Sequence, residues 1–267
     1  MSENIEKVVV GNIVGVPVPC YTNTEPLLND IGGIKASEHA DGFNKVLIND
    51  LLTELLYPYT APVINSVTLS PAAGTKKRGI GITLNSVSTK ITKKSKIISR
   101  VSLFKDSTLV ASKSKDLDGI NITSSGTTIT FSDLNDILDG NDDVTYTIKV
   151  FEEGSNNAVI KSATYTFVNP YYYGIINKTD EINADLITGL TEVIEVKGNK
   201  SRTYTTTSDQ CAVIAYPSSY DELKSIIDAN NFSQIWDKYT VTIDGIEYYV
   251  YVSGAASVTD FKYTFSY

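Results

Sequence analysis

The chain has 267 residues and a formal net charge of -8, with 42% hydrophobic and 20% charged residues. This composition excludes a disordered protein, because a chain of this length and apolar content can form real cores. The acidic balance disfavours nucleic-acid binding, which needs clustered positive charge to neutralise phosphates. Ser, Thr, Val, Ile and Tyr are abundant, so we predict a mostly β protein.

Residues 1–30 are predicted to form an extended arm. The run VVVGNIVGVPVPCY is apolar but has no helical period. Gly11, Gly15 and Pro17 interrupt it, so we expect neither a secretion signal nor a membrane span. The arm either adds as a strand or lies in a groove on a neighbour, or it forms the first strand of the chain's own sheet.

Residues 31–62 are predicted to contain one amphipathic helix. Gly32-Gly33 indicates a turn before it, and Pro58 and Pro62 end it. Its apolar side chains cover about half of the helix circumference, which is more than one core-facing stripe needs. We interpret the helix as held from two sides, by its own domain and by a second chain or the arm; a helix buried within its own domain is the alternative. The predicted interface residues are Val46, Leu47, Ile48, Leu51, Leu52, Leu55, Leu56 and Tyr57.

Residues 60–168 are predicted to form an immunoglobulin-like β-sandwich. Seven short strands separated by turn signals over about 100 residues are typical of such a domain. Tyr146, near the start of one strand, is a candidate for the corner tyrosine of these folds. There is no Cys–Trp–Cys core, which excludes an antibody-type domain. The predicted strands are Val63–Leu69, Gly79–Leu84, Ile97–Phe104, Thr108–Ser112, Thr127–Phe131, Val144–Phe151 and Ala158–Val168.

Residues 169–267 are predicted to form a second β-rich domain. Asn169–Gly174 is interpreted as the junction, and Tyr220–Asp228 as a helix with its apolar residues on one side. Asp244-Gly245 is a strong two-residue hairpin signal. The predicted strands are Glu192–Val196, Arg202–Thr206, Ala212–Tyr216, Tyr239–Ile243, Glu247–Val252 and Phe261–Tyr267.

The sequence contains no recognisable catalytic, cofactor or metal motif. The single histidine, His39, has no nucleophile motif beside it. Cys20 and Cys211 lie far apart and are interpreted as free thiols of a reducing compartment. The acidic run Asp139–Asp143 lacks the spacing of a calcium loop and has the residues that turns need. We therefore predict a protein that is not an enzyme and has no cofactor or metal.

Two clusters of side chains remain. The basic cluster is interpreted as the protection of an exposed strand edge, because no aromatic residue is interleaved as nucleic-acid binding would require; it contains Lys90, Lys93, Lys94, Lys96 and Arg100. The second cluster is the aromatic-rich C-terminal domain, whose rings fill a core, form a protein interface or stack on sugars. The candidate glycan surface consists of Tyr220, Trp236 and Tyr239.

Several short motifs, taken in their order, resemble tailed-bacteriophage virion proteins, including those of crAss-like phages. They are Ile31–Ile34, Leu55–Tyr59 followed by Pro62, Asn169–Gly174, Ala215–Tyr220 and Val258–Phe265. In such fibre, tail and head-decorating proteins, the first two motifs lie in the segment that joins an attachment arm to immunoglobulin-like domains. The chain departs from the commoner pattern at Lys35-Ala36-Ser37, where a glycine is more usual. The resemblance implies a structural, non-enzymatic role and a homo-oligomer.

The leading hypothesis is a virion structural protein that is assembled in the host cytoplasm. Residues 1–59 would dock it on other virion proteins and on copies of itself, without nucleic acid or membrane. The alternative is a receptor-binding adhesin that recognises host surface glycan through the C-terminal domain. A polysaccharide depolymerase ranks last, because such an enzyme needs a cleft with paired carboxylates.

Overall fold

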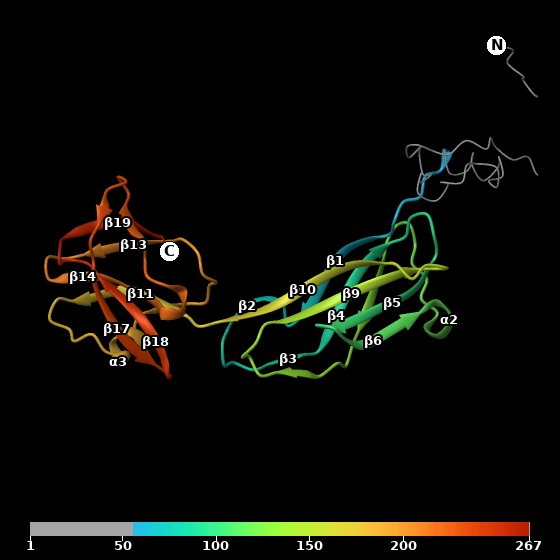
Figure 1. Ribbon diagram of the computed structural model, residues 1–267, viewed down its shortest axis with the longest axis horizontal. Helices are drawn as coiled ribbons and strands as arrows, with labels where there is room; N and C mark the ends of the chain where they lie inside the picture. The colour runs from blue at the N-terminus through green and yellow to red at the C-terminus, as the bar shows by residue number, and fades with distance from the viewer. Residues whose placement is uncertain (1–55, 267) are drawn as a thin grey trace, which may run out of the picture. The chain divides into compact units, whose positions relative to one another are not determined.

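A computed structural model describes residues 56–266 (Figure 1). The predicted arm, most of the predicted helix, His39 and Cys20 lie outside the described residues. The chain divides into two compact units, Met1–Ala61 and Pro62–Tyr267. The prediction of a mostly β protein is confirmed, since the described helices are short: α2 (Lys115–Asp118), α3 (Ala184–Thr188) and the 3-10 turn η2 (Ser218–Tyr220).

Residues 63–168 form two sheets and a small ribbon (Figure 1). The first sheet is antiparallel, in the order β1 (Val63–Ser70), β4 (Ser86–Thr92), β7 (Thr127–Phe131). The second has the order β2 (Gly74–Lys77), β10 (Ala158–Val168), β9 (Val144–Glu152), β5 (Ile98–Lys105), β6 (Thr108–Ser114). The ribbon pairs β3 (Ile82–Leu84) with β8 (Asp136–Leu138). We call this part the first sandwich.

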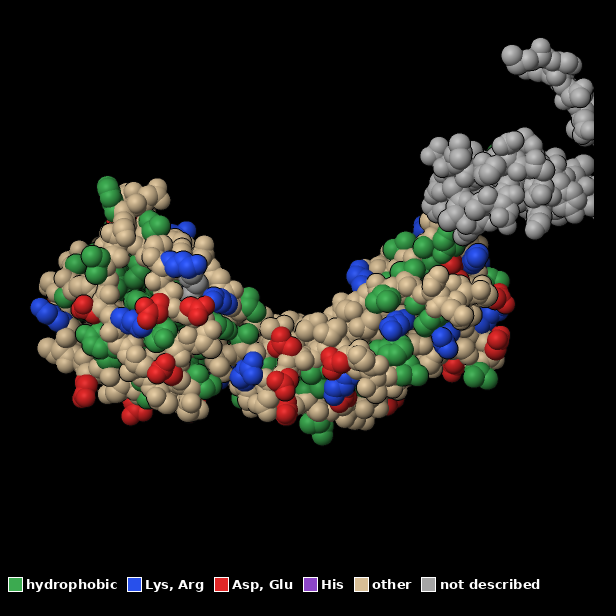
Figure 2. All heavy atoms as spheres, in the orientation of Figure 1, with side chains coloured by type: hydrophobic (Ala, Val, Ile, Leu, Met, Phe, Trp, Pro, Cys, Tyr) green, Lys and Arg blue, Asp and Glu red, His purple; other side chains and the backbone are tan. Residues whose placement is uncertain are grey.

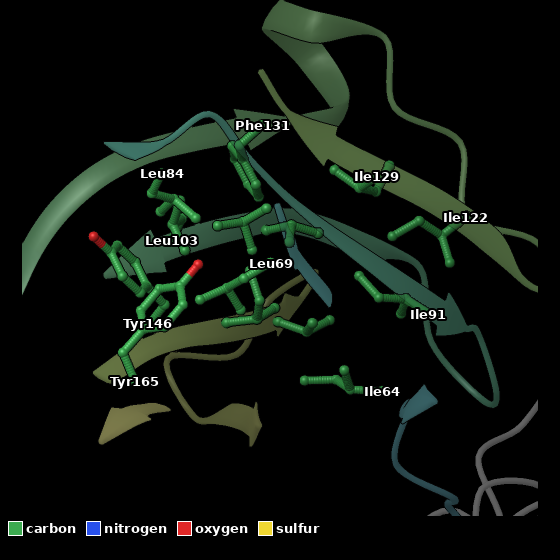
Figure 3. Packing of buried hydrophobic residues seen from close by; sticks show 14 of the residues in the cluster. Ile64, Leu69, Leu84, Ile91, Leu103, Ile122, Ile129, Phe131, Tyr146 and Tyr165 are labelled. Carbon is green, nitrogen blue, oxygen red and sulfur yellow. The ribbon is translucent and has the colours of Figure 1, made fainter. Parts of the chain in front are cut away.

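Alternation along the strands builds the core of the first sandwich. In β9, Tyr146, Ile148 and Val150 are completely buried, whereas Thr147 and Lys149 between them are half-buried on the outer face. The opposite sheet contributes side chains such as Val87 and Ile91 to the same cluster. Figure 3 shows Tyr146 and Tyr165 at one end of this cluster and Ile122 at the other.

All seven strands predicted for this region are present, five of them with shifted ends. β4 was not predicted, and it is the central strand of its sheet. The edge-protection interpretation is therefore wrong for Lys90, which projects from this central strand, while Lys93, Lys94 and Lys96 lie in the turn between β4 and β5. The immunoglobulin-like assignment stays a prediction.

The corner-tyrosine prediction needs a correction. In that motif the tyrosine hydroxyl bonds to the backbone a few residues upstream. Here the Tyr146 hydroxyl donates to Oδ2 of Asp136 at 2.5 Å. The Lys105 ammonium donates to the other oxygen of the same carboxylate at 2.9 Å. This trio joins the β3–β8 ribbon to the second sheet.

Residues 171–266 form two further sheets, which we call the second sandwich (Figure 1). One sheet has the order β12 (Thr191–Val193), β11 (Tyr171–Asn177), β14 (Gln210–Pro217), β18 (Ile246–Val252), β17 (Asp237–Ile243). The other has the order β13 (Lys200–Thr206), β19 (Val258–Ser266), β15 (Ser225–Asp228), β16 (Ser233–Gln234).

Strand β14 is buried on both faces. Ala212, Ile214 and Tyr216 belong to an aromatic cluster with β15 and β19. Cys211 and Val213 belong to an aliphatic cluster that includes Ile187 of α3. Two-sided burial explains why QCAVIAYP is a nearly continuous apolar run and does not alternate.

Two predictions for the second sandwich are wrong. Tyr220–Asp228 is not a helix: it contains the end of η2 and the strand β15. Ile226 pairs with Phe265 of β19 and is buried, so pairing with a distant strand overrides the local helical pattern. The predicted junction Asn169–Gly174 is mostly strand. Strand β11 begins at Tyr171, so only two residues separate it from the end of β10 at Val168.

Candidate functional site

Only two of the predicted interface residues lie among the described residues. Leu56 is 69% exposed and Tyr57 is 76% exposed, just before the first sandwich begins. Tyr59, two residues further on, is 52% exposed. Large apolar side chains so exposed and so close in the sequence are typical of a surface that a partner covers. The other predicted interface residues, Val46 to Leu55, lie outside the described residues.

The three residues of the predicted glycan surface lie in three different environments. Trp236 is only 8% exposed, and its ring centroid lies 5.0 Å from that of Tyr263 and 5.3 Å from that of Phe265. It is a core residue and presents no face on which a sugar could stack. Tyr239 is 43% exposed on the edge strand β17. Tyr220 is half-buried at the end of η2, with its ring centroid 5.6 Å from that of Tyr171.

Tyr220 lines a hollow of about 590 Å³ close to the connection between β10 and β11. We call it the junction hollow. Its wall is largely polar and consists of Arg78, Asp142, Asp143, Thr166, Phe167, Val168, Asn169, Ser219 and Tyr220. Apart from Tyr220, no residue of this wall had been predicted as a binding residue. The wall residues come from four separate parts of the sequence, so only the topology brings them together.

Backbone groups hold the charged side chains of the junction hollow in place. The Arg78 guanidinium donates to the carbonyl oxygen of Phe167 at 2.9 Å and to that of Asn141. One oxygen of Asp143 accepts from the Phe167 amide at 2.8 Å. These bonds fix one positive and one negative charge in the wall.

Other polar groups of the junction hollow are available to a ligand. The side chains of Asp142, Asn169 and Ser219 make no hydrogen bond with any residue between 56 and 266. Burial raises the pKa of Tyr220; Arg78 lowers it and Asp143 raises it, and the net direction is upward. The phenol is therefore a neutral donor and acceptor near pH 7. Donors, acceptors and an aromatic ring around one hollow suit a ligand rich in hydroxyl groups.

The predicted acidic turn has a structural use. The Asp139 carboxylate accepts from the Asn141 amide at 2.9 Å, and this bond is the main cause that lowers its pKa. Asp143 is held by Phe167. Within the described residues, no group of three His, Cys, Asp or Glu side chains is placed to hold a metal ion.

Charges of both signs are interspersed over the face of residues 56–266 that Figure 2 shows. No described helix is long and apolar enough to cross a membrane. Comparison of the chain with protein-family models, with curated proteins and with solved structures finds no match.

Proposed function

We propose that this chain is a structural component of a tailed-bacteriophage particle, docked on neighbouring virion proteins and on its own copies through residues 1–59, for which the sequence predicts an arm and a helix. The observation that carries the proposal is the exposure of Leu56 and Tyr57, at 69% and 76%. Both belong to the predicted interface. Burying a large apolar side chain contributes about 1.5–3 kcal/mol, so a neighbour that covers both would gain substantially.

The organisation of the chain suits a docking protein, because two β-rich sandwiches follow the contact segment in the sequence. The first and second sandwiches have separate apolar cores. Only Asn169 and Pro170 lie between their strands. The sandwiches would then project from the particle or decorate it, while residues 1–59 make the attachment.

The molar mass of the purified chain in solution tests the self-association. We expect the wild-type chain to have a mass of at least twice 29.1 kDa, and a mass of 29.1 kDa would contradict self-association. The double substitution Leu56→Glu and Tyr57→Glu should weaken association about a hundredfold or more, because two charges replace buried apolar groups. Sedimentation equilibrium measures both.

Leu117→Glu is the matched control, because Leu117 is 91% exposed on α2 and is not part of the predicted interface. It should leave the mass unchanged. Incorporation is tested separately: a chain that lacks residues 1–57 should be missing from purified particles. Full occupancy of that truncated chain in particles would refute docking through this segment.

A second candidate function is a receptor-binding adhesin, favoured by one observation, the position of Tyr220 in the wall of the junction hollow. Arg78 contributes one positive charge there, and Asp142 and Asp143 contribute two negative charges. This balance disfavours anionic sugars and favours neutral ones. The site differs from the surface predicted with Trp236, whose ring is buried.

Saturation-transfer NMR with N-acetylglucosamine and with glucuronate tests this second function. We expect contact with the neutral sugar only, and a loss of about fivefold or more in affinity for the double variant Asp142→Ala and Ser219→Ala. Tyr239→Phe is the control, since Tyr239 lies outside the hollow wall. Equal saturation of both sugars, or none in the wild type, would contradict the adhesin at this site.

A further inference from the structure

The first sandwich has an apolar slot at the end where β4 turns into β5. Four isoleucines line it, Ile97, Ile98, Ile120 and Ile122, together with Lys93 and Lys115. Its volume is about 260 Å³. Figure 3 shows Ile122 at the end of the core away from Tyr146 and Tyr165. The slot is therefore an opening onto the core of the first sandwich.

Local hydrogen bonds fix the walls of the slot. The Lys93 amide donates to the Thr123 carbonyl at 3.0 Å, and the Glu153 amide donates to the Ile97 carbonyl at 2.8 Å. Helix α2 forms another part of the wall and ends at Gly119, whose φ of 64° is the left-handed value that glycine adopts readily. A ligand would meet a preformed opening and would not have to order a loop.

The floor and the rim of the slot differ in exposure. Ile98 and Ile122 are 3% and 5% exposed and belong to the core cluster. Ile97 is 40% exposed at the rim. An apolar group that enters would cover Ile97 and extend the core outward, which is favourable in proportion to the apolar area removed from water.

The two lysines supply positive charge beside this apolar floor. Lys93 is half-buried and Lys115 is exposed. Neither forms an ion pair with any residue of the range 56–266. The nearby Asp118 carboxylate does not line the slot and accepts from the Ser114 amide at 2.7 Å. The slot therefore combines an apolar floor with two positive charges, although the chain as a whole has a net charge of -8.

We propose that this slot binds the C-terminal residue of a partner protein that ends in an aliphatic side chain. The aliphatic side chain would fill the floor, and the terminal carboxylate would lie between the two ammonium groups. The volume favours one side chain over a whole small ligand, since pockets for such ligands hold about 300–1,000 Å³. Charge complementarity favours the carboxylate. The inference does not depend on residues 1–59 and stands apart from the proposed function.

Isoleucine-methyl NMR of the full chain tests the slot with three probes: acetylglycyl-leucine, its carboxamide, and acetylglycyl-serine. We expect the first to shift the methyl signals of Ile97, Ile120 and Ile122, with affinity at least fivefold higher than that of either other peptide. The carboxamide has the side chain without the charge, and the serine peptide has the charge without the side chain.

The double substitution Lys93→Gln and Lys115→Gln should weaken acetylglycyl-leucine at least fivefold and leave the carboxamide unchanged. Lys90→Gln and Lys94→Gln change the net charge by the same amount but lie outside the slot wall, so they are the matched control. Equal shifts with acid and amide, or equal weakening by the control pair, would overturn the proposal. Stronger binding of decanoate than of the peptide would also overturn it, in favour of a fatty acid.

Discussion

Replacing Trp236 with alanine is expected to destabilise the second sandwich by about 3–5 kcal/mol, the usual cost of removing a large aromatic side chain from a core. The Trp236 ring contacts Tyr263, Phe265 and Tyr204 at centroid distances of 5.0, 5.3 and 6.1 Å. Urea unfolding followed by far-UV circular dichroism measures the loss. A variant that leaves the fold intact at unchanged urea midpoint would contradict the core position.

Tyr239→Ala is the matched control for Trp236→Ala. Tyr239 is an exposed aromatic residue three positions further along the chain, so its removal should change stability by about 0.5 kcal/mol or less. The comparison also bears on the adhesin. A loss of sugar binding in Trp236→Ala would report unfolding of the second sandwich, and it would say nothing about a sugar that stacks on the ring.

The second large effect is expected at Asp136. Asp136→Asn keeps the shape of the side chain but removes the charge that accepts from Tyr146 and Lys105. Hydrogen bonds to a charged group contribute about 1.5–3 kcal/mol, so we expect a loss of this size at pH 7. Chemical unfolding at a series of pH values measures it.

The pH dependence of this effect has a definite sign. Burial raises the pKa of Asp136, but the hydrogen bonds from Lys105 and Tyr146 and the Lys105 charge outweigh it, so the pKa is lowered. A carboxyl group with a lowered pKa stabilises the fold above its unfolded pKa of about 4. This stability is lost as the pH falls through the folded pKa, so the difference between wild type and Asp136→Asn should shrink below about pH 4.

Asp133→Asn, at an exposed turn position with positive φ, is the control. A difference that is equal at pH 3 and pH 7 would refute the ionic contribution.

The sequence predicted strands well where one face is buried and the other is in water. Thr127–Phe131 and Ala158–Val168 have their predicted bounds, and Val144–Glu152 extends the prediction by one residue. β11 was missed because Tyr171 and Tyr172 both enter cores, one on each face of the sheet, and the pattern lacks a polar face. β4 was missed because its lysine, serine and threonine residues outnumber the inward Val87 and Ile91.

The candidate sites depended on contacts between distant segments. Nothing in the sequence near Trp236 distinguishes a buried ring from a surface ring, since its burial follows from packing against Tyr204 of β13 and against Tyr263 and Phe265 of β19. The junction hollow and the slot have the same origin. Lys93 and Lys115 are 22 residues apart and Asp142 and Ser219 are 77 residues apart, and each pair meets only when strands have paired. Hydrophobic periodicity and composition describe one helix or strand at a time. They therefore predict secondary-structure elements better than sites, which combine residues from several elements.

Strand β19 lies inside its sheet, between β13 and β15, although it contains the last described residues. Domains generally fold in order as the ribosome delivers the chain. The first sandwich has all its strands once Val168 has been made. In the second sandwich, β13 and β15 both pair with β19, so they lack this common partner until the chain has been made as far as Ser266. A nascent chain therefore carries one finished domain and one open aromatic-rich sheet, and chaperones that recognise apolar surface have a target there until β19 has been made.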